Sequence, residues 1–350
     1  MFLKNAWYVA AWGHEVTQAL SQIIVLNEKI CIYRTSKNEI VALEDACPHR
    51  KLPLSKGRIK DDNLECGYHG LTFDCAGQCV WAPGAGRIPS NAQVRSYPVH
   101  EKYGLIWIWM GNAAIADIDE IFDIPNFDNP AWGKNSGKAM ELDCNYLYMC
   151  DNLLDPTHVA WVHEGSFGQA ATKETPLRVS KRDDGIIVHR WMENVEPAPF
   201  YKKVIAFEGN CDRLQHYEVR YPSHAIIKAV FTPAGTGGEK STENETLHED
   251  VFIMDSYNFM TPITEKKTRY YWFQLRNIRP NDEALSKLMS DDVKKAFDED
   301  VAVLNAVQIG MDNKTSPHID LSIDSGQLRF RRKLQAMIQE EAMVDAHMQK

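Results

Sequence analysis

Two short brackets of cysteine and histidine are the first residues in this chain whose types and spacing suggest chemistry. The first bracket is Cys47-x-His49 and the second, after sixteen intervening residues, is Cys66-x-x-His69. Each bracket offers one thiol and one imidazole, so the two together can supply two different pairs of ligands. Two Cys on one iron and two His on the other form the ligand set of a Rieske [2Fe–2S] centre.

A zinc ion is the first alternative for these four residues, because Cys and His together also hold zinc in a closed tetrahedron. Zinc brackets usually pair like with like, as two Cys followed by two His. Here each bracket mixes the two donor types, and a single residue separates Cys47 from His49. The pattern therefore favours the iron–sulfur cluster over zinc, and over a purely structural role for all four residues.

A second group of possible metal ligands lies between residues 151 and 163. It contains His158 and His163 together with Asp155, and two imidazoles with a carboxylate suit a mononuclear metal. On a regular helix, His158 and His163 would lie about 140° apart. Both can bind one metal only if the helix bulges, breaks or ends between them.

The remaining ligand is predicted on a long helix between residues 281 and 309. Its apolar residues recur at intervals of four and three: Val293, Phe297, Leu304 and Val307. Asp300 falls in this stripe, and a carboxylate on a core-facing stripe is nearly always paired or bound to metal. A neighbouring Arg is one possible partner, but the two His favour a 2-His-1-carboxylate site. Asp298 and Glu299 fall off the stripe, so we expect them to be solvated.

Short strands must carry the two Cys/His brackets. Branched and aromatic residues between 22 and 45, interrupted by polar turns, predict a small antiparallel unit, which residues 104–109 close with another strand. We therefore expect a first, all-β domain over residues 1–112. Residues 113–140 are rich in Pro, Asp and Asn and are predicted to be a connection.

A second domain is predicted over residues 113–350. Strand-like segments recur from Val179 to Leu275, and the long helix follows them. Residues 233–250 are polar and rich in Gly, which predicts a mobile loop, and an amphipathic helix near 327–343 is expected to pack on the outside. The predicted fold class is therefore α+β, with a small all-β domain followed by an antiparallel sheet with helices.

The composition is that of an ordinary globular chain, with 44% hydrophobic and 25% charged residues. The net charge of −9 does not indicate nucleic-acid binding. The sequence has no run of 18 apolar residues, so no membrane-spanning helix is predicted. The N-terminus lacks the pattern of a signal peptide, and eight Cys in 350 residues do not form a disulfide framework. We therefore expect a cytoplasmic protein without nucleic-acid or membrane partners.

Together these residues resemble the Rieske non-heme iron oxygenases over nearly the whole chain, and most closely the branch of vanillate and dicamba O-demethylase oxygenase components. The resemblance implies a Rieske domain followed by a helix-grip catalytic domain. It implies these cluster ligands: Cys47, His49, Cys66 and His69. It implies these iron ligands: His158, His163 and Asp300. It also assigns Asp155 to a bridging carboxylate and Asn152 to a polar residue near the iron.

The same resemblance implies an activity and its partners. Members activate O₂ at a mononuclear Fe(II), with electrons from NAD(P)H delivered by a separate flavin/[2Fe–2S] reductase or a ferredoxin. The branch suggests a substituted aromatic acid as substrate, with O-demethylation of a methoxybenzoate such as vanillate expected first and ring or methyl hydroxylation as the alternative. It also implies a homotrimer in which His69 of one subunit, Asp155 of the next and His158 of that same neighbour connect the two metal sites.

One position departs from the pattern, and one other class of protein competes with it. Dicamba-type enzymes have a His that binds the substrate carboxylate where this chain has Asn258, so Asn258 is the candidate for a substrate contact at this position. A Rieske electron carrier is the competing class. Respiratory carriers have a disulfide between the two loops, but this chain has Leu52 and Tyr68 at those positions. A carrier also leaves the second domain without a purpose.

Overall fold

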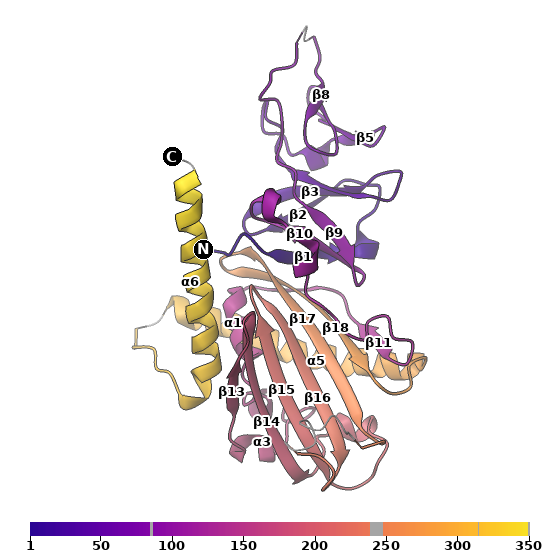
Figure 1. Ribbon diagram of the computed structural model, residues 1–350, viewed down its shortest axis with the longest axis vertical. Coiled ribbons are helices and arrows are strands. Elements are labelled where there is room, and N and C mark those ends of the chain that lie inside the picture. The colour runs from indigo at the N-terminus through magenta and orange to yellow at the C-terminus, as the bar shows by residue number, and fades with distance from the viewer. Residues whose placement is uncertain (85–86, 239–247, 314, 349–350) are drawn as a thin grey trace. The chain divides into compact units, whose positions relative to one another are not determined.

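The computed structural model describes residues 1–84, 87–238, 248–313 and 315–348 (Figure 1). The chain divides into two compact units. The first contains Met1–Asp123, Thr261–Glu265 and the residues from Ile338 onward, and the second contains Ile124–Met260 and Lys266–Met337. These units confirm the predicted class of a small antiparallel domain combined with a sheet-plus-helix domain.

The described residues of the first unit form three antiparallel sheets. One sheet has the order β1-β10-β9, with strands Trp7–Trp12, Leu105–Trp109 and Val99–Lys102. The next contains β2, β3 and β4, at Ser21–Val25, Glu28–Arg34 and Ile40–Glu44. The last contains β5 to β8, at Arg58–Lys60, Asn63–Glu65, Thr72–Phe73 and Cys79–Trp81. The strands predicted between 22 and 45 and at 104–109 are thus confirmed.

Short 3-10 turns connect these strands and lead out of the sheets. They are η1 to η4, at Gly13–Glu15, Leu54–Lys56, Ala113–Ile115 and Ile118–Glu120. The turn η2 lies between the two Cys/His brackets, and its Leu54 is fully buried. The brackets therefore sit on loops that are anchored by an apolar residue between them.

The second unit is organised around one large antiparallel sheet. Its strand order is β11-β18-β17-β16-β15-β14-β13, at Gly133–Ser136, Lys267–Arg276, Phe252–Thr264, His224–Pro233, Cys211–Arg220, Gly185–Val195 and Arg178–Lys181. A further strand, β12 at Met140–Leu142, also pairs with β18. The recurring strands predicted from Val179 to Leu275 are therefore present.

The segment predicted as a connection differs in part from the expectation, because it contains β11 and the first residue of β12. The sequence of β11 has no branched or aromatic residue that would indicate a strand. Pairing with β18, from Gly133 opposite Arg276 to Ser136 opposite Phe273, gives this segment its extended form. Tertiary context thus outweighs local propensity here.

Helices cover the sheet of the second unit, and the long helix α5 lies across one of its faces (Figure 1). The α-helices are α1 Tyr146–Asn152, α2 Val159–Val162, α3 Ala171–Glu174, α5 Glu283–Asp312 and α6 Ser325–Met348. The described residues also form the 3-10 turns η5 Tyr201–Lys203 and η6 Ser322–Asp324. Both helices predicted near the C-terminus are present, with α5 beginning at its Asp282 cap, which accepts a hydrogen bond from the Leu285 amide at 2.8 Å.

The buried stripe of α5 corrects one sequence prediction. The buried residues of α5 are Leu285, Met289, Val293, Ala296, Asp300, Leu304 and Gln308. Val307, predicted in the stripe, is 39% exposed. The buried face keeps a spacing of four after Ala296, so Gln308 takes the inward position, and its Oε1 accepts a hydrogen bond from the Asn145 amide at 2.9 Å.

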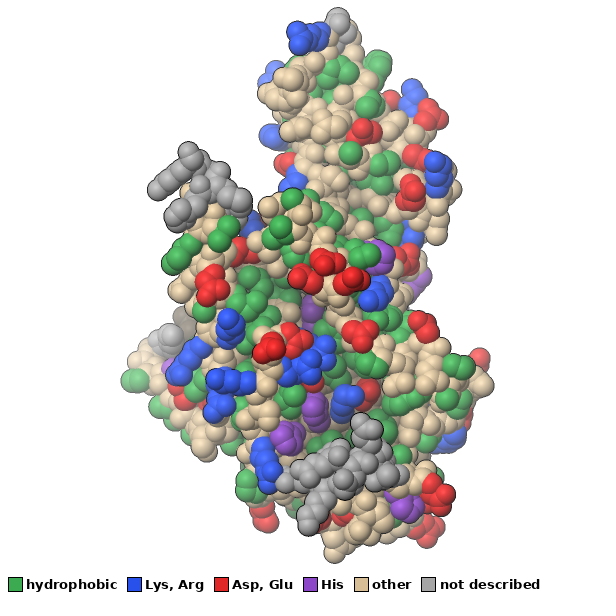
Figure 2. Space-filling model, in the orientation of Figure 1, with side chains coloured by type: hydrophobic (Ala, Val, Ile, Leu, Met, Phe, Trp, Pro, Cys, Tyr) green, Lys and Arg blue, Asp and Glu red, His purple; other side chains and the backbone are tan. Residues whose placement is uncertain are grey.

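Charges on the visible surface are mixed in sign. In the face shown in Figure 2, Lys and Arg side chains alternate with Asp and Glu. None of the described helices combines the length and the hydropathy that crossing a membrane needs. The loop predicted at 233–250 includes residues 239–247, which lie outside the described residues.

Candidate functional site

The two Cys/His loops of the first unit have the same main-chain pattern. In each loop the Cys amide donates to the carbonyl five residues later, Cys47 to Leu52 at 2.9 Å and Cys66 to Leu71 at 2.8 Å. Each Cys carbonyl also accepts from the amide four residues later, at 2.8 and 3.0 Å. Two matching tight loops therefore present their Cys and His side chains in the same way, as a two-sided cluster site requires.

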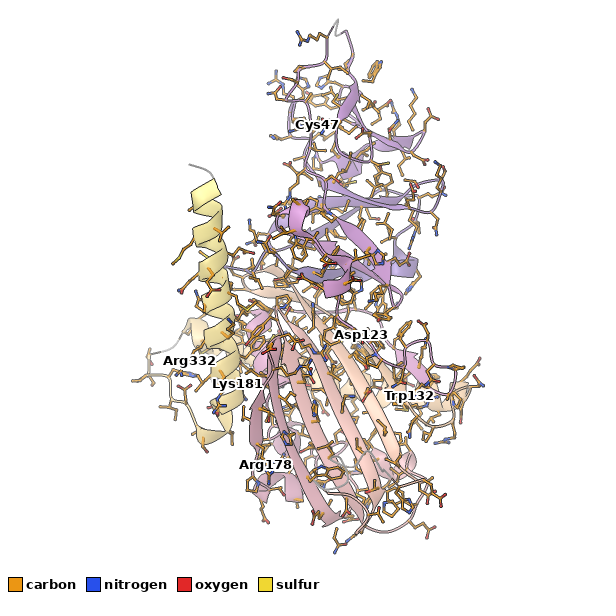
Figure 3. The ribbon with its side chains drawn as sticks, in the orientation of Figure 1. Cys47, Asp123, Trp132, Arg178, Lys181 and Arg332 are labelled. Carbon is orange, nitrogen blue, oxygen red and sulfur yellow. The ribbon has the colours of Figure 1, made fainter. Side chains whose placement is uncertain are left out.

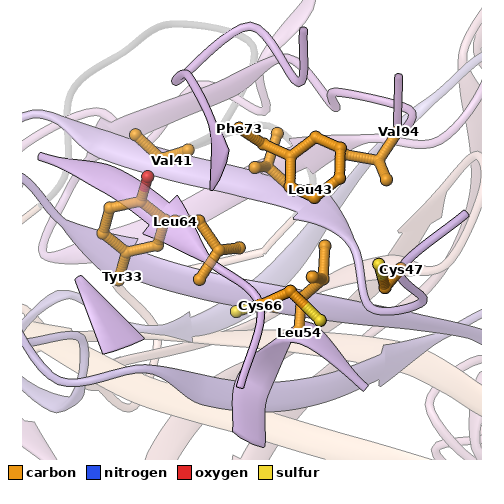
Figure 4. Packing of buried hydrophobic residues seen from close by; sticks show 10 residues of the cluster. Tyr33, Val41, Leu43, Cys47, Leu54, Leu64, Cys66, Phe73 and Val94 are labelled. Atoms are coloured by element: carbon orange, nitrogen blue, oxygen red, sulfur yellow. The ribbon is translucent and has the colours of Figure 1, made fainter. Parts of the chain in front are cut away.

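The thiols and the imidazoles of these loops lie in different environments. Cys47 and Cys66 are each 2% exposed and belong to one apolar cluster with Leu54 (Figure 4). His49 and His69 are exposed, and their ring centroids lie 4.7 Å apart. Figure 3 shows Cys47 among the loops of the first unit. The site thus has a dry sulfur side and a solvent-facing nitrogen side.

The spread of these four donors fits a two-iron cluster better than one zinc ion. Among the described residues, no three of these four side chains bring their donor atoms within 4.8 Å of one another. One tetrahedral zinc would draw all four donors together, whereas a [2Fe–2S] cluster holds its two ligand pairs on separate irons. Burial raises the pKa of the Cys47 thiol, so the thiolate needs a nearby metal charge.

A compact group of three donors lies in the second unit. The donor atoms of His158, His163 and Asp300 all lie within 4.8 Å of one another. Asp300 Oδ1 is 3.6 Å from His158 Nε2 and 3.2 Å from His163 Nε2. Two imidazole nitrogens and one carboxylate oxygen converging in this way form the donor set of a facial-triad iron site.

The opposite nitrogens of the two imidazoles are held by acceptors. His158 Nδ1 donates to the Asp155 carbonyl, and His163 Nδ1 donates to Glu299 Oε2 at 2.7 Å. Because both Nδ1 atoms bond oxygens, both carry the proton, and both Nε2 lone pairs face Asp300. The residues present therefore fit a divalent metal with neutral imidazole ligands.

A helix that ends early allows the two His to meet. The helix α2 spans only Val159–Val162, with His158 immediately before it and His163 immediately after it. His163 has φ −114° and ψ 32°, which is outside the helical region. The condition that the sequence imposed, a helix ending between the two His, is thus met, and the ring centroids lie 5.3 Å apart.

Glu299 was expected to be solvated, and it is only partly so, because it also binds an imidazole. Its side chain is 35% exposed and binds His163, so the consecutive residues Glu299 and Asp300 contact the same imidazole. The His163 imidazole lies close enough to α5 to contact Glu299, although Glu299 is one residue away from the buried stripe. Burial opposes protonation of His163, but Asp300 and Glu299 raise its pKa above the ordinary value. The site therefore attracts positive charge.

Asn152 and Asp155 lie beside this triad. Asn152 is 9% exposed, and its Nδ2 donates to Asp300 Oδ1 at 3.0 Å. Asp155 contacts His158 through its main-chain oxygen, while its carboxylate Oδ1 accepts from the Thr157 amide at 2.7 Å. The predicted neighbours of the iron ligands are thus brought together, although the contact of Asp155 with His158 is not made by the carboxylate.

A mostly apolar cavity opens beside the triad. The three donor residues and Asn152 line one part of it, and aromatic side chains such as Phe167 line the rest. Its polar lining also includes Arg213 and Ser256, which the sequence analysis did not single out. A concave apolar site with few polar groups is typical of small-molecule binding.

Asn258 is not among the residues that line this cavity. It is fully buried, its Oδ1 accepts from the Tyr270 hydroxyl at 2.6 Å, and its Nδ2 donates to the Ser256 carbonyl at 2.9 Å. Both ends of this amide are therefore engaged within the protein.

Comparison with known proteins gives matches over both units. The Rieske [2Fe-2S] domain family matches residues 6–98, and the vanillate O-demethylase oxygenase C-terminal domain family matches residues 142–340. The iron–sulfur subunit of the toluene-4-sulfonate monooxygenase system of Comamonas testosteroni is 36% identical, over 97% of this chain and 98% of that protein. A vanillate O-demethylase oxygenase subunit of a Pseudomonas strain is 34% identical, over 97% and 96%.

Solved structures agree with these matches. Dicamba monooxygenase bound to 3,6-dichlorosalicylic acid superposes with a TM-score of 0.87 at 30% identity, covering 97% of this chain and 99% of that one. Another structure of dicamba monooxygenase contains non-heme iron and dicamba. The predicted cofactors, a Rieske [2Fe–2S] cluster and a mononuclear iron, are supported by these relatives and by the two donor sets described above. The chain therefore belongs to the Rieske oxygenases, in the branch of the vanillate O-demethylase oxygenase subunits.

Proposed function

We propose that this chain is the terminal oxygenase component of a monooxygenase that oxidises a substituted aromatic acid. One observation carries the proposal: His158, His163 and Asp300 converge on one point at the wall of a mostly apolar cavity. A carrier of electrons needs no such cavity. The convergence supports a site at which a small aromatic molecule lies next to a metal.

The side chains around the two sites have distinct proposed roles. Cys47, His49, Cys66 and His69 would hold the cluster, and His158, His163 and Asp300 would hold the mononuclear iron. When bound, the cluster supplies electrons singly and the iron offers open positions for O₂ beside the substrate. Glu299 and the Asp155 carbonyl fix the imidazole tautomers, and Asn152 orients the Asp300 carboxylate.

Partners of the chain follow from the same proposal. Electrons would come from NAD(P)H through a separate flavin/[2Fe–2S] reductase or a ferredoxin, and the exposed His49 and His69 support docking at that side. We also propose a homotrimer in which Asp155 links His158 to the partner's His69. Within the described chain, Asp155 Oδ2 accepts no hydrogen bond, which supports a contact with another subunit. All eight cysteines are free, which supports a reducing cytoplasm.

The names of the relatives narrow the range of substrates to propose. Two of them are named for aromatic anions, vanillate and toluene-4-sulfonate. We place oxidative O-demethylation of a methoxybenzoate first. Hydroxylation of a ring or of a methyl group is the alternative, and the relative named for toluene-4-sulfonate favours it because toluene-4-sulfonate has a methyl group and no methoxy group.

Oxygen consumption tests the proposal. Purified chain with a reductase and NADH would be screened against methoxybenzoates and methylbenzenesulfonates, with O₂ uptake and formaldehyde measured together. Formaldehyde in step with O₂ indicates O-demethylation, and O₂ uptake with a hydroxylated product indicates the alternative.

A variant of the triad separates the oxygenase from an electron carrier. Asp300→Ala removes the carboxylate ligand from the second unit and leaves the Cys/His loops of the first unit untouched. The visible spectrum of the cluster is expected to remain, while substrate-dependent O₂ uptake disappears. The proposed function would be refuted if the cluster of the wild-type protein is reduced by the reductase but no aromatic compound causes O₂ uptake.

A further inference from the structure

A buried guanidinium lies on the wall of the cavity beside the triad. Arg213 of β15 is 2% exposed, and it lines the same cavity as His158, His163 and Asp300. Buried charges are normally paired, because an unpaired charge loses its hydration without compensation. Among the described residues, no Asp or Glu side chain forms an ion pair with Arg213.

Aromatic rings hold the guanidinium in place. Its Cζ lies 4.9 Å from the ring centroid of Tyr201 and 5.2 Å from that of Phe231, the residue opposite Arg213 on β16. Nη1 donates to Gln169 Oε1 at 2.6 Å and to the Phe167 carbonyl at 3.4 Å. These contacts fix the plane of the group and use one of its terminal nitrogens.

The Arg213 guanidinium keeps at least one donor without a partner among the described residues. Nε is buried without a hydrogen-bond partner, and the guanidinium also donates a hydrogen bond to the Tyr201 hydroxyl. Nε and Nη2 form one edge of the guanidinium, and this edge matches the two oxygens of a carboxylate or a sulfonate. Because Arg213 lines the cavity and its Nε has no partner, this guanidinium is available for an anion.

Ring contacts connect this edge of the cavity to the metal donors. The His163 ring lies 6.4 Å from Phe167, Phe167 lies 5.7 Å from Tyr201, and Tyr201 lies under Arg213. The wall between the triad and the guanidinium is thus aromatic. Such a wall suits the ring of an aromatic ligand that reaches from one end to the other.

We propose that Arg213 binds the anionic group of the substrate, a carboxylate or a sulfonate on an aromatic ring, and thereby directs the opposite side of the ring towards the triad. The inference rests on the proposed oxygenase function and adds the residue that recognises the acid group of the substrate. Arg213 is then the residue that determines specificity for acids over neutral aromatic compounds.

The sheet register separates this anchor from Asn258. Arg213 and Val219 are six residues apart on β15, and the row of Val219 continues through Ala225 to Asn258. At about 3.3 Å per residue, the two rows are roughly 20 Å apart along the strands. The acid anchor in this chain is therefore at a different end of the sheet from the position that the resemblance suggested.

Binding without turnover tests the proposal. Wild-type holoenzyme, anaerobic and without reductant, is titrated calorimetrically with vanillate and with its neutral amide, and then with toluene-4-sulfonate and toluene-4-sulfonamide. The acids are expected to bind at least about tenfold tighter than the amides. Arg213→Gln should weaken binding of the acids by about 10- to 100-fold and leave the amides nearly unchanged.

Arg276→Gln is the matched control. Arg276 of β18 is fully buried and also has unpaired Nε and Nη1 atoms, but it does not line the cavity. Its replacement removes a second buried guanidinium from the same sheet and should leave the ratio of acid to amide affinity unchanged. An equal change of this ratio in both variants would overturn the role of Arg213.

Two further outcomes would also overturn it. One is equal weakening of acid and amide by Arg213→Gln, which indicates a structural role only. The other is equal affinity of the wild-type enzyme for acid and amide, which decides the question even where the variant does not fold. Either result together with normal O₂ uptake refutes only the role of Arg213 as the anchor. Absence of O₂ uptake with every aromatic compound refutes the proposed function.

Discussion

Replacement of Glu299 tests the geometry of the mononuclear site most directly. Its Oε2 accepts a hydrogen bond from His163 Nδ1 at 2.7 Å, and 35% of the Glu299 side chain is exposed. A hydrogen bond to a charged group contributes about 1.5–3 kcal/mol, and exposure puts this one near the lower value. About 1.5 kcal/mol corresponds to roughly tenfold in an equilibrium constant. We therefore expect Glu299→Ala to weaken metal binding at the triad about tenfold, as is usual for partners of metal-bound imidazoles.

Competition with a chelator measures this affinity, and the cluster absorbance of the same sample reports on the first unit. Glu299→Gln should fall between wild type and Glu299→Ala, since an amide oxygen still accepts the hydrogen bond but carries no charge. Asp298→Asn is the control, because Asp298 is exposed and pairs with Lys294 at 2.6 Å. Equal metal affinity in Glu299→Ala and Asp298→Asn would refute the reasoning.

Three other changes have defined outcomes. Asp155→Asn should keep the cluster spectrum and the metal at the triad but lose turnover, because an amide cannot replace a bridging carboxylate; normal turnover with reductase would contradict the bridge. Asp282→Ala removes the cap of α5 and should cost about 1 kcal/mol, seen as a lower midpoint in thermal unfolding; an unchanged midpoint would count against the cap. Although burial opposes ionisation of Glu218, His216 and Arg220 lower its pKa from 4.5 to about 2. Ionised Glu218 therefore stabilises the fold above about pH 4.5, and this contribution is lost as the pH falls towards 2. Glu218→Gln should unfold at lower urea concentration near neutral pH, with a difference that shrinks below pH 4.5, and a difference independent of pH would contradict the sign.

The metal-ligand candidates could be predicted because their spacing is local. The brackets at Cys47 and Cys66 need only two tight loops, and the loops follow from short strands whose residues indicate β-structure. The pair of His158 and His163 needed one assumption, a helix that ends between them, and α2 is that short. Asp300 could be found because a carboxylate in an apolar stripe is unusual on its own.

The residues that were missed depend on contacts between distant parts of the chain. Glu299 is one step off the stripe, and it gains a partner only because His163, immediately after α2, approaches α5. Arg213 lies in a strand, where an Arg usually points to solvent. It is enclosed only because Phe231 of the neighbouring strand and Tyr201 of η5 pack against it. Gln308 replaces Val307 in the buried face because the α5 spacing stays at four after Ala296. None of these three residues could be identified from a periodic pattern in the sequence.

The charges around the cavity connect the cation site with the anion anchor. Asp300 supplies one negative charge, and both imidazoles are neutral when their Nδ1 atoms hold the protons. A divalent iron then leaves the triad positive, which Glu299 offsets only in part because solvent reaches it. Arg213 adds a second positive group to the same cavity, so the two groups repel unless an anion accompanies them. A bound aromatic acid removes this repulsion and a neutral amide does not. Since such coupling is reciprocal, the acid should raise the affinity of the triad for metal in the chelator competition, and an equal effect of the amide would contradict this account.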